Sequence, residues 1–130
     1  MMRRLTDHRG QSLVEFAVVA PVFLMIVLGL VDGARAVWHY NTLAQATREG
    51  TRYAIVRSGA TASQIESVVR EHASGLDQND LTVTVSFPDG DSKPGDRVDV
   101  RASYRFDPLF DLVGLPGITM TSSSRMTIQH

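Results

Sequence analysis

Hydrophobic residues are concentrated in one long run near the start of the chain, Leu13–Val31, in which Glu15 is the only charged residue. At about 1.5 Å per residue, a helix of this length is about long enough to cross a hydrocarbon core, which takes roughly 20 apolar residues. Arg3, Arg4 and Arg9 precede the run. Because positive residues favour the cytoplasmic side, we expect a short cytoplasmic N-terminus and export of everything that follows the run.

Helical spacing continues beyond the apolar run. We expect Asp32 and Arg35 at the interface on the exported side, and Trp38 with Tyr40 is a candidate pair of aromatic membrane anchors. A stripe of mostly small residues follows at helical spacing, on which a sheet could pack closely. Its members are Tyr40, Leu43, Ala44, Thr47, Gly50 and Ala54. Ser58-Gly59 indicates the end of this helix, because glycine is favoured just past a helix C-terminus.

A short second helix is predicted directly afterwards. Thr61 and Gln64 have the spacing of a capping box, in which each residue satisfies a backbone N–H of the other at a helix start. Ile65 and Val69 then lie on one helical face, together with Val68 and His72. Ser74-Gly75 ends the segment.

In the second half of the chain the hydrophobic period changes from helical to two, which indicates half-buried strands. Such alternation occupies 81–87, 97–106 and 118–128, and the first two of these runs are separated by a turn rich in proline and glycine. The predicted fold class is therefore α+β: a long N-terminal helix and a short helix, with a three-stranded antiparallel sheet laid on them. The loop 107–117 is rich in leucine and phenylalanine, and we expect it to form a lid over the small core rather than an exposed contact patch.

Glu15 is the strongest candidate for a functional residue. A carboxylate inside an apolar membrane segment is costly, and it favours a helix N-terminus electrostatically. Gly10 lies five residues before it. The alternative is a hydrated carboxylate in the headgroup region with no partner, and the combined spacing favours a functional role.

These features resemble a type IV-like prepilin, which has a short basic leader, a glycine at the cleavage point, a glutamate five residues later and a hydrophobic helix. More specifically, the chain resembles the TadE-like minor pilins, or pseudopilins, of tight-adherence pilus systems. The residues that carry this resemblance are Arg9-Gly10-Gln11-Ser12-Leu13-Val14-Glu15-Phe16-Ala17, Pro21, Gly29 and Arg48-Glu49-Gly50-Thr51-Arg52-Tyr53-Ala54. Phe16 stands where the major pilins often carry tyrosine, and together with the sizeable exported domain it favours a minor pilin.

The resemblance implies three segments: a leader at 1–10, a transmembrane helix at 11–36 and an exported domain at 37–130. A membrane aspartyl prepilin peptidase would cut after Gly10 and leave a new α-amino group on Gln11. In the family, the glutamate at the position of Glu15 pairs with the N-terminal amine of a neighbouring subunit. The other implied partners are the major pilin, a sister minor pilin and the inner-membrane assembly platform, and the implied role is assembly, priming or tip decoration of a fibre.

The rest of the sequence offers little chemistry. The four histidines, His8, His39, His72 and His130, have no neighbours at metal-ligand spacing, and no nucleophile turn or phosphate loop is present. The formal net charge is −1 and no basic cluster stands out, which argues against nucleic acid. We therefore expect no catalytic residues, no metal and no cofactor.

Two other functions remain as alternatives. Ala34-Arg35-Ala36 follows the apolar run like a signal-peptidase site, which would release a secreted binding domain. Glu15 inside the run and helical spacing that continues through Ala36 argue against that cut. A signal-anchored periplasmic enzyme is the other possibility, and the missing catalytic constellation disfavours it.

Overall fold

The computed structural model describes residues 8–90, 92–110, 114 and 116–129. The elements are α1 (His8–Val56), α2 (Ala62–His72), β1 (Leu81–Ser86), β2 (Arg97–Phe106) and β3 (Ile118–Thr127). The α+β class, the order of the elements and their approximate bounds agree with the prediction from the sequence.

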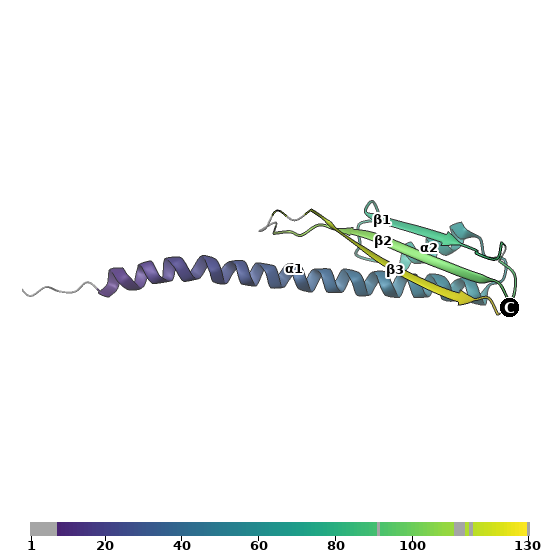
Figure 1. Cartoon of the computed structure of the whole chain (residues 1–130), viewed down its shortest axis with the longest axis horizontal. Helices are drawn as coiled ribbons and strands as arrows, with labels where there is room; N and C mark the ends of the chain where they lie inside the picture. The colour runs from purple at the N-terminus through teal and green to yellow at the C-terminus, as the bar shows by residue number, and fades with distance from the viewer. Residues whose placement is uncertain (1–7, 91, 111–113, 115, 130) are drawn as a thin grey trace, which may run out of the picture.

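One helix runs along almost the whole molecule. α1 is 49 residues long and continues through Pro21 without a break in its assignment. Its N-terminal half stands free of the rest of the chain, and its C-terminal half carries α2 and the sheet (Figure 1). The protein is therefore a rod with a small domain built onto one end.

The sheet is antiparallel with the strand order β1-β2-β3, so β2 is central and both of its neighbours are edge strands. Val100 in β2 lies opposite Val85 and Ser124. Alternate residues of β2 are buried against the helices, while residues between them, such as Arg101 and Arg105, are exposed. β2 and β3 contact α1, and β1 contacts α2. This register confirms the predicted inward face of the second strand.

The buried face of α1 is made of small residues and one leucine. Leu43, Ala46, Thr47, Thr51 and Ala54 are fully buried. The two threonines bury no unpaired hydroxyl, because each donates to the carbonyl four residues earlier, at 2.7 and 2.8 Å. At Gly50, which is also buried, a Cβ would clash with the Val69 side chain, so glycine permits the close approach of α2.

The predicted stripe on α1 is confirmed for four of its six residues, since Leu43, Thr47, Gly50 and Ala54 are buried. Tyr40 is 49% exposed and Ala44 is only partly buried, whereas Ala46 and Thr51 are inside. The prediction was therefore wrong only at Tyr40 and Ala44, and the centre of the buried face lies slightly to one side of the predicted stripe.

The predicted capping box of α2 is confirmed. The Gln64 N–H donates to Thr61 Oγ1 at 3.4 Å, and the Thr61 N–H donates to Gln64 Oε1 at 3.1 Å. At the other end of the helix, Arg70 pairs with Glu66 and donates to the carbonyl of Leu81 at 3.3 Å. That hydrogen bond ties α2 to the first residue of β1.

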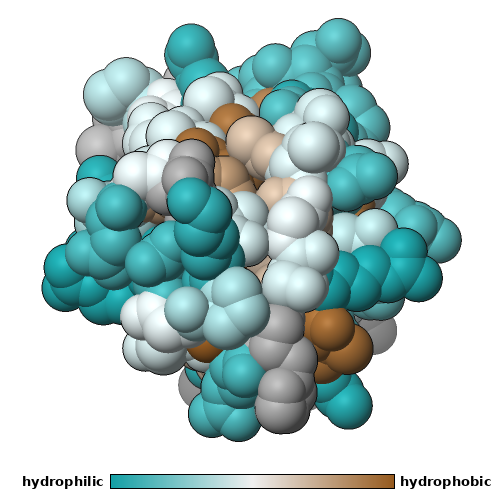
Figure 2. Space-filling model, turned by 90° about the vertical axis from the view of Figure 1, so that its right-hand side faces the viewer, coloured by the Kyte–Doolittle hydropathy of each residue, from teal (hydrophilic) through white to brown (hydrophobic). Residues whose placement is uncertain are grey.

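The two ends of the molecule differ in polarity. Seen from the end that carries the domain, the surface is mainly hydrophilic (Figure 2). The opposite end is the free part of α1, whose large apolar side chains are exposed. This asymmetry gives the rod one end suited to water and one end suited to an apolar environment.

Candidate functional site

The free half of α1 exposes an unusual amount of apolar surface. Within the described part of the chain, one helix is long and apolar enough to cross a membrane, and its apolar part is not buried by any other element. Leu13, Phe16 and Leu30 are each about 70% exposed. An apolar surface of this extent marks a membrane or protein interaction site, because monomeric proteins in water rarely leave one uncovered.

The three residues predicted for processing and assembly all lie at the start of this helix. Gly10, Gln11 and Glu15 are exposed, and α1 already begins at His8. Apart from its chain neighbours and the backbone of its own helix, no described atom lies within 4 Å of the position that a Cβ on Gly10 would take. Gln11 and Glu15 are four residues apart and so lie on one helix face, one turn from each other. Glu15 has no hydrogen bond or ion pair with any residue that the structure describes, so its carboxylate is available to a partner.

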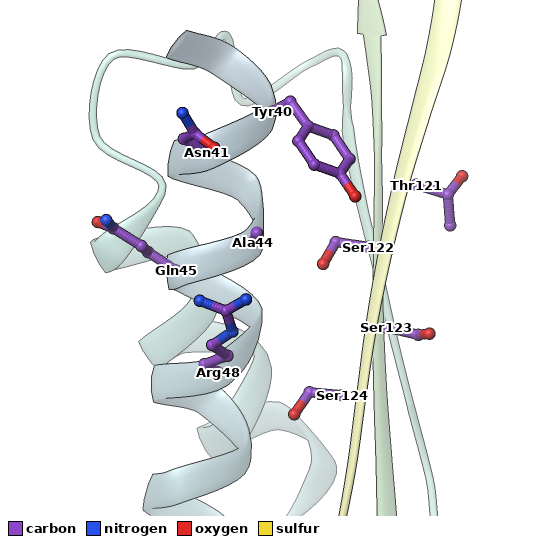
Figure 3. A pocket seen from close by; sticks show the side chains of 9 residues that line it. All are labelled: Tyr40, Asn41, Ala44, Gln45, Arg48, Thr121, Ser122, Ser123 and Ser124. Carbon is purple, nitrogen blue, oxygen red and sulfur yellow. The ribbon is translucent and has the colours of Figure 1, made fainter. Parts of the chain in front are cut away.

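A polar groove of about 480 Å³ lies between the C-terminal half of α1 and the edge strand β3 (Figure 3). Its helix wall is formed by Tyr40, Asn41, Ala44, Gln45 and Arg48, and its strand wall by Thr121, Ser122, Ser123 and Ser124. Among the strands that the structure describes, β3 pairs with β2 alone. The groove therefore combines hydroxyl groups and a guanidinium with the unpaired edge of a sheet.

Residues 10–52 match the family model of TadE-like proteins. The match covers the N-terminal part of the chain and less than half of its length. The matched segment includes Gly10, Glu15, the exposed apolar helix and the helix wall of the groove, and it ends four residues before α1 does. No match was found among curated proteins or among solved structures.

The TadE-like match supports a minor pilin-like role associated with tight-adherence pili. TadE-like proteins are a structural, non-enzymatic family, and the exposed apolar helix fits anchoring in a membrane. Among the residues that the structure describes, no three histidine, aspartate or glutamate side chains gather to hold a metal ion.

Asp32, within the TadE-like region, makes a contact that the sequence did not predict. Its carboxylate accepts the backbone N–H of Leu109 at 3.1 Å and that of Phe110 at 2.9 Å, and Arg35 Nη1 donates to it at 3.0 Å. Only 8% of Asp32 is exposed. A carboxylate this well satisfied fixes the loop after β2 to the helix, because each hydrogen bond to a charged group is worth about 1.5–3 kcal/mol.

This contact changes the interpretation of the apolar loop 107–117. The expected lid would bury its side chains, but Leu109 is 65% exposed and Phe110 is 38% exposed. For these residues the lid prediction was wrong, since their backbone faces α1 while their side chains remain uncovered. The predicted lid residues 111–113 and 115 lie outside the described part of the chain.

His39 is the second residue whose role was missed. It is buried among aromatic rings, with centroids 5.3 Å from both Tyr104 and Phe106, and its Nδ1 has no hydrogen-bond partner among the described residues. Burial lowers the pKa of His39 below its usual value of 6.5, and the nearby Arg35 guanidinium lowers it further. The histidine is therefore held in its neutral form by the packing of α1 against β2.

We expect this histidine to make stability pH-dependent. Above the usual pKa of 6.5, His39 is neutral in both states and contributes no pH dependence. As the pH falls below that value, the unfolded chain binds a proton that the folded chain resists, so the free energy of unfolding should decrease. Urea unfolding of the full chain in detergent from pH 7.5 to 5 measures this slope. His39→Phe should flatten it, and the exposed control His72→Gln should retain it; an unchanged slope in His39→Phe would mean that another group causes it.

Proposed function

We propose that this chain is a non-enzymatic minor pilin, or pseudopilin, of a tight-adherence pilus, processed after Gly10 by a prepilin peptidase. Its N-terminus would be cytoplasmic, the helix 11–36 would span the inner membrane, and residues 37–130 would form a domain on the periplasmic side. The partners would be the major pilin, a sister minor pilin and the inner-membrane assembly platform. The observation that carries this proposal is the TadE-like match over the exposed apolar helix that begins at Gly10.

The placement of Glu15 supports an assembly role. Cleavage after Gly10 would create an α-amino group on Gln11, one helical turn from Glu15 of the same chain and close to the end of the bilayer-spanning segment. A buried carboxylate and a buried ammonium group are each costly in lipid, and pairing them across two subunits relieves both costs. Because Glu15 has no partner among the described residues, its counter-charge would come from the new terminus of this chain or of a neighbour.

The start of α1 also fits a cleavage site. Glycine destabilises a helix by about 1 kcal/mol relative to alanine, so the first turn around Gly10 opens at little cost. Apart from its two chain neighbours, no described residue places a side chain within 4 Å of a Cβ at this position. A peptidase could therefore reach the bond after Gly10 without disturbing the domain, which lies at the far end of the rod (Figure 1).

Deletion of the gene in a piliated host tests the function. We expect loss of surface fibres, restored by the wild-type chain. Reporter fusions after His130 test the membrane topology. A reporter that works only in the periplasm should be active, and a reporter that works only in the cytoplasm should be silent. Normal fibres in the deletion strain, or activity of the cytoplasmic reporter, would contradict the proposal.

A further inference from the structure

We propose that the start of the loop after β2 docks on the membrane surface through the side chains of Leu109 and Phe110. The partner is the boundary between headgroups and acyl chains in the leaflet from which α1 emerges. The inference rests on the proposed membrane anchoring of α1 and adds a second point of contact. The exported domain would then be held at a fixed orientation on the lipid instead of standing free above it.

The backbone N–H groups of Leu109 and Phe110 donate to the Asp32 carboxylate, and we call this contact the Asp32 clamp. The clamp sets the position of the loop along the axis of α1. Asp32 is the first charged residue after the apolar run that ends at Val31, so it marks the level at which α1 leaves the hydrocarbon. Its carboxylate holds the backbone nitrogens of Leu109 and Phe110 at 3.1 and 2.9 Å. These two residues therefore lie level with the end of the apolar run, although 77 and 78 positions separate them from Asp32.

The side chains of Leu109 and Phe110 are not part of the hydrophobic core of the domain. Phe106, four residues before Phe110, is buried against α1, whereas Leu109 and Phe110 are uncovered. Burial of apolar surface is worth about 25 cal/mol per Å², so covering them with lipid is favourable. Leucine and phenylalanine are also typical of the apolar faces that interfacial segments bury at the boundary between headgroups and acyl chains.

The polarity of the surface changes along α1 in the way that a membrane interface requires. Below the clamp, from residue 16 to residue 31, the exposed surface of α1 is apolar. Above it, Trp38 is half exposed, six residues or about 9 Å further along the helix axis, and a charged pair, Arg105–Asp107, lies at the end of β2. The far end of the domain is mainly hydrophilic (Figure 2). The apolar side chains of the loop thus lie at the level where the apolar surface of α1 ends, which favours lipid over a separate protein partner.

Depth-dependent fluorescence quenching tests the docking. Trp38→Phe removes the single tryptophan, and new ones are introduced one at a time by Phe110→Trp, by Phe23→Trp in the apolar helix and by Thr84→Trp on the outer face of β1. Each full-length variant is reconstituted into phosphatidylcholine liposomes with or without brominated acyl chains. We expect quenching at positions 23 and 110, with position 110 quenched most by bromines near the headgroup, and almost none at position 84.

The outcomes separate the two proposals. If position 23 is quenched and position 110 behaves like position 84, α1 is inserted but the loop is not docked. If position 23 is not quenched, the membrane anchoring fails and the docking fails with it. Quenching at position 110 that depends on protein density and not on brominated lipid would assign the loop to a second copy of the chain and overturn the inference.

The clamp itself is tested by Asp32→Ala in the Phe110→Trp chain. Loss of the carboxylate frees the loop, so quenching at position 110 should fall at least twofold while quenching at position 23 is unchanged in the corresponding chain. Asp32→Asn, which keeps one oxygen acceptor, should lie between the two. Unchanged quenching in Asp32→Ala would show that the clamp does not position the loop.

Discussion

Replacing Glu15 with glutamine is expected to abolish surface fibres while leaving the chain inserted and processed. Glutamine keeps the shape and hydrogen bonding of glutamate but removes the charge, which lowers the cost of placing this position in lipid. Insertion should therefore be as good as in the wild type or better. What is lost is the counter-charge for an α-amino group during subunit association.

The experiment compares leader removal with fibre yield in the same cells, by immunoblot and by electron microscopy. Glu15→Asp, which keeps the charge on a shorter side chain, is the matched control and should recover part of the fibre yield. A wild-type fibre yield from Glu15→Gln would make Glu15 an ordinary interfacial carboxylate, and the proposed assembly mechanism would be wrong.

Val100→Asp is expected to destroy the exported domain. Val100 is completely buried in the central strand, opposite Val85 and Ser124. An aspartate there would bury a charge without a partner, at a cost of several kcal/mol, which is comparable to the whole stability of a small domain. The variant chain should be degraded and should not accumulate in the membrane fraction.

Arg101→Ala is the matched control for this change. Arg101 is the next residue in β2, lies on the exposed face and has no ion pair among the described residues. Its loss should change the free energy of unfolding by less than about 0.5 kcal/mol. Limited proteolysis of both variants gives the comparison, and equal resistance would contradict the strand register.

Local patterns in the sequence were enough to predict most of the fold. The alternation along 97–106 placed each second residue of β2 inside, because one face of an antiparallel sheet packs on helices while the other meets water. Thr61 and Gln64 predicted the start of α2 because a capping box depends only on residues three apart. The apolar run and the spacing of Gly10 and Glu15 can likewise be recognised in the sequence, because all of these residues lie within one helix.

The features that the sequence did not predict depend on contacts between distant segments. Nothing near Asp32 indicates that it holds the backbone of Leu109 and Phe110, because backbone N–H groups carry no sequence signal. One edge of the buried face of α1 was misplaced because Ala44 and Ala46 are equally small, so packing rather than composition decides between them. His39 is an ordinary polar residue in the sequence, and its pKa is lowered by burial against the rings of β2 and by the nearby Arg35 guanidinium.

The structure also limits how Glu15 can act. The domain and the start of α1 lie at opposite ends of the rod, so no residue of the described domain can reach Glu15 (Figure 1). Any partner for the carboxylate therefore belongs to the terminus of this chain or to another chain. Under the proposed function, variants at the two ends of the rod should therefore have independent effects.

The mass of the mature N-terminus, measured on protein purified from membranes of a host with its own prepilin peptidase, tests the central claim most directly. The account predicts a chain that begins at Gln11, and retention of the full leader when Gly10→Val adds bulk at the cleavage point. Gly10→Val should not disturb the fold, because no described atom lies near the added side chain. A wild-type chain that begins after Ala36 would assign the apolar run to a signal peptide, and a mature chain beginning at Gln11 in the Gly10→Val variant would contradict the role of Gly10.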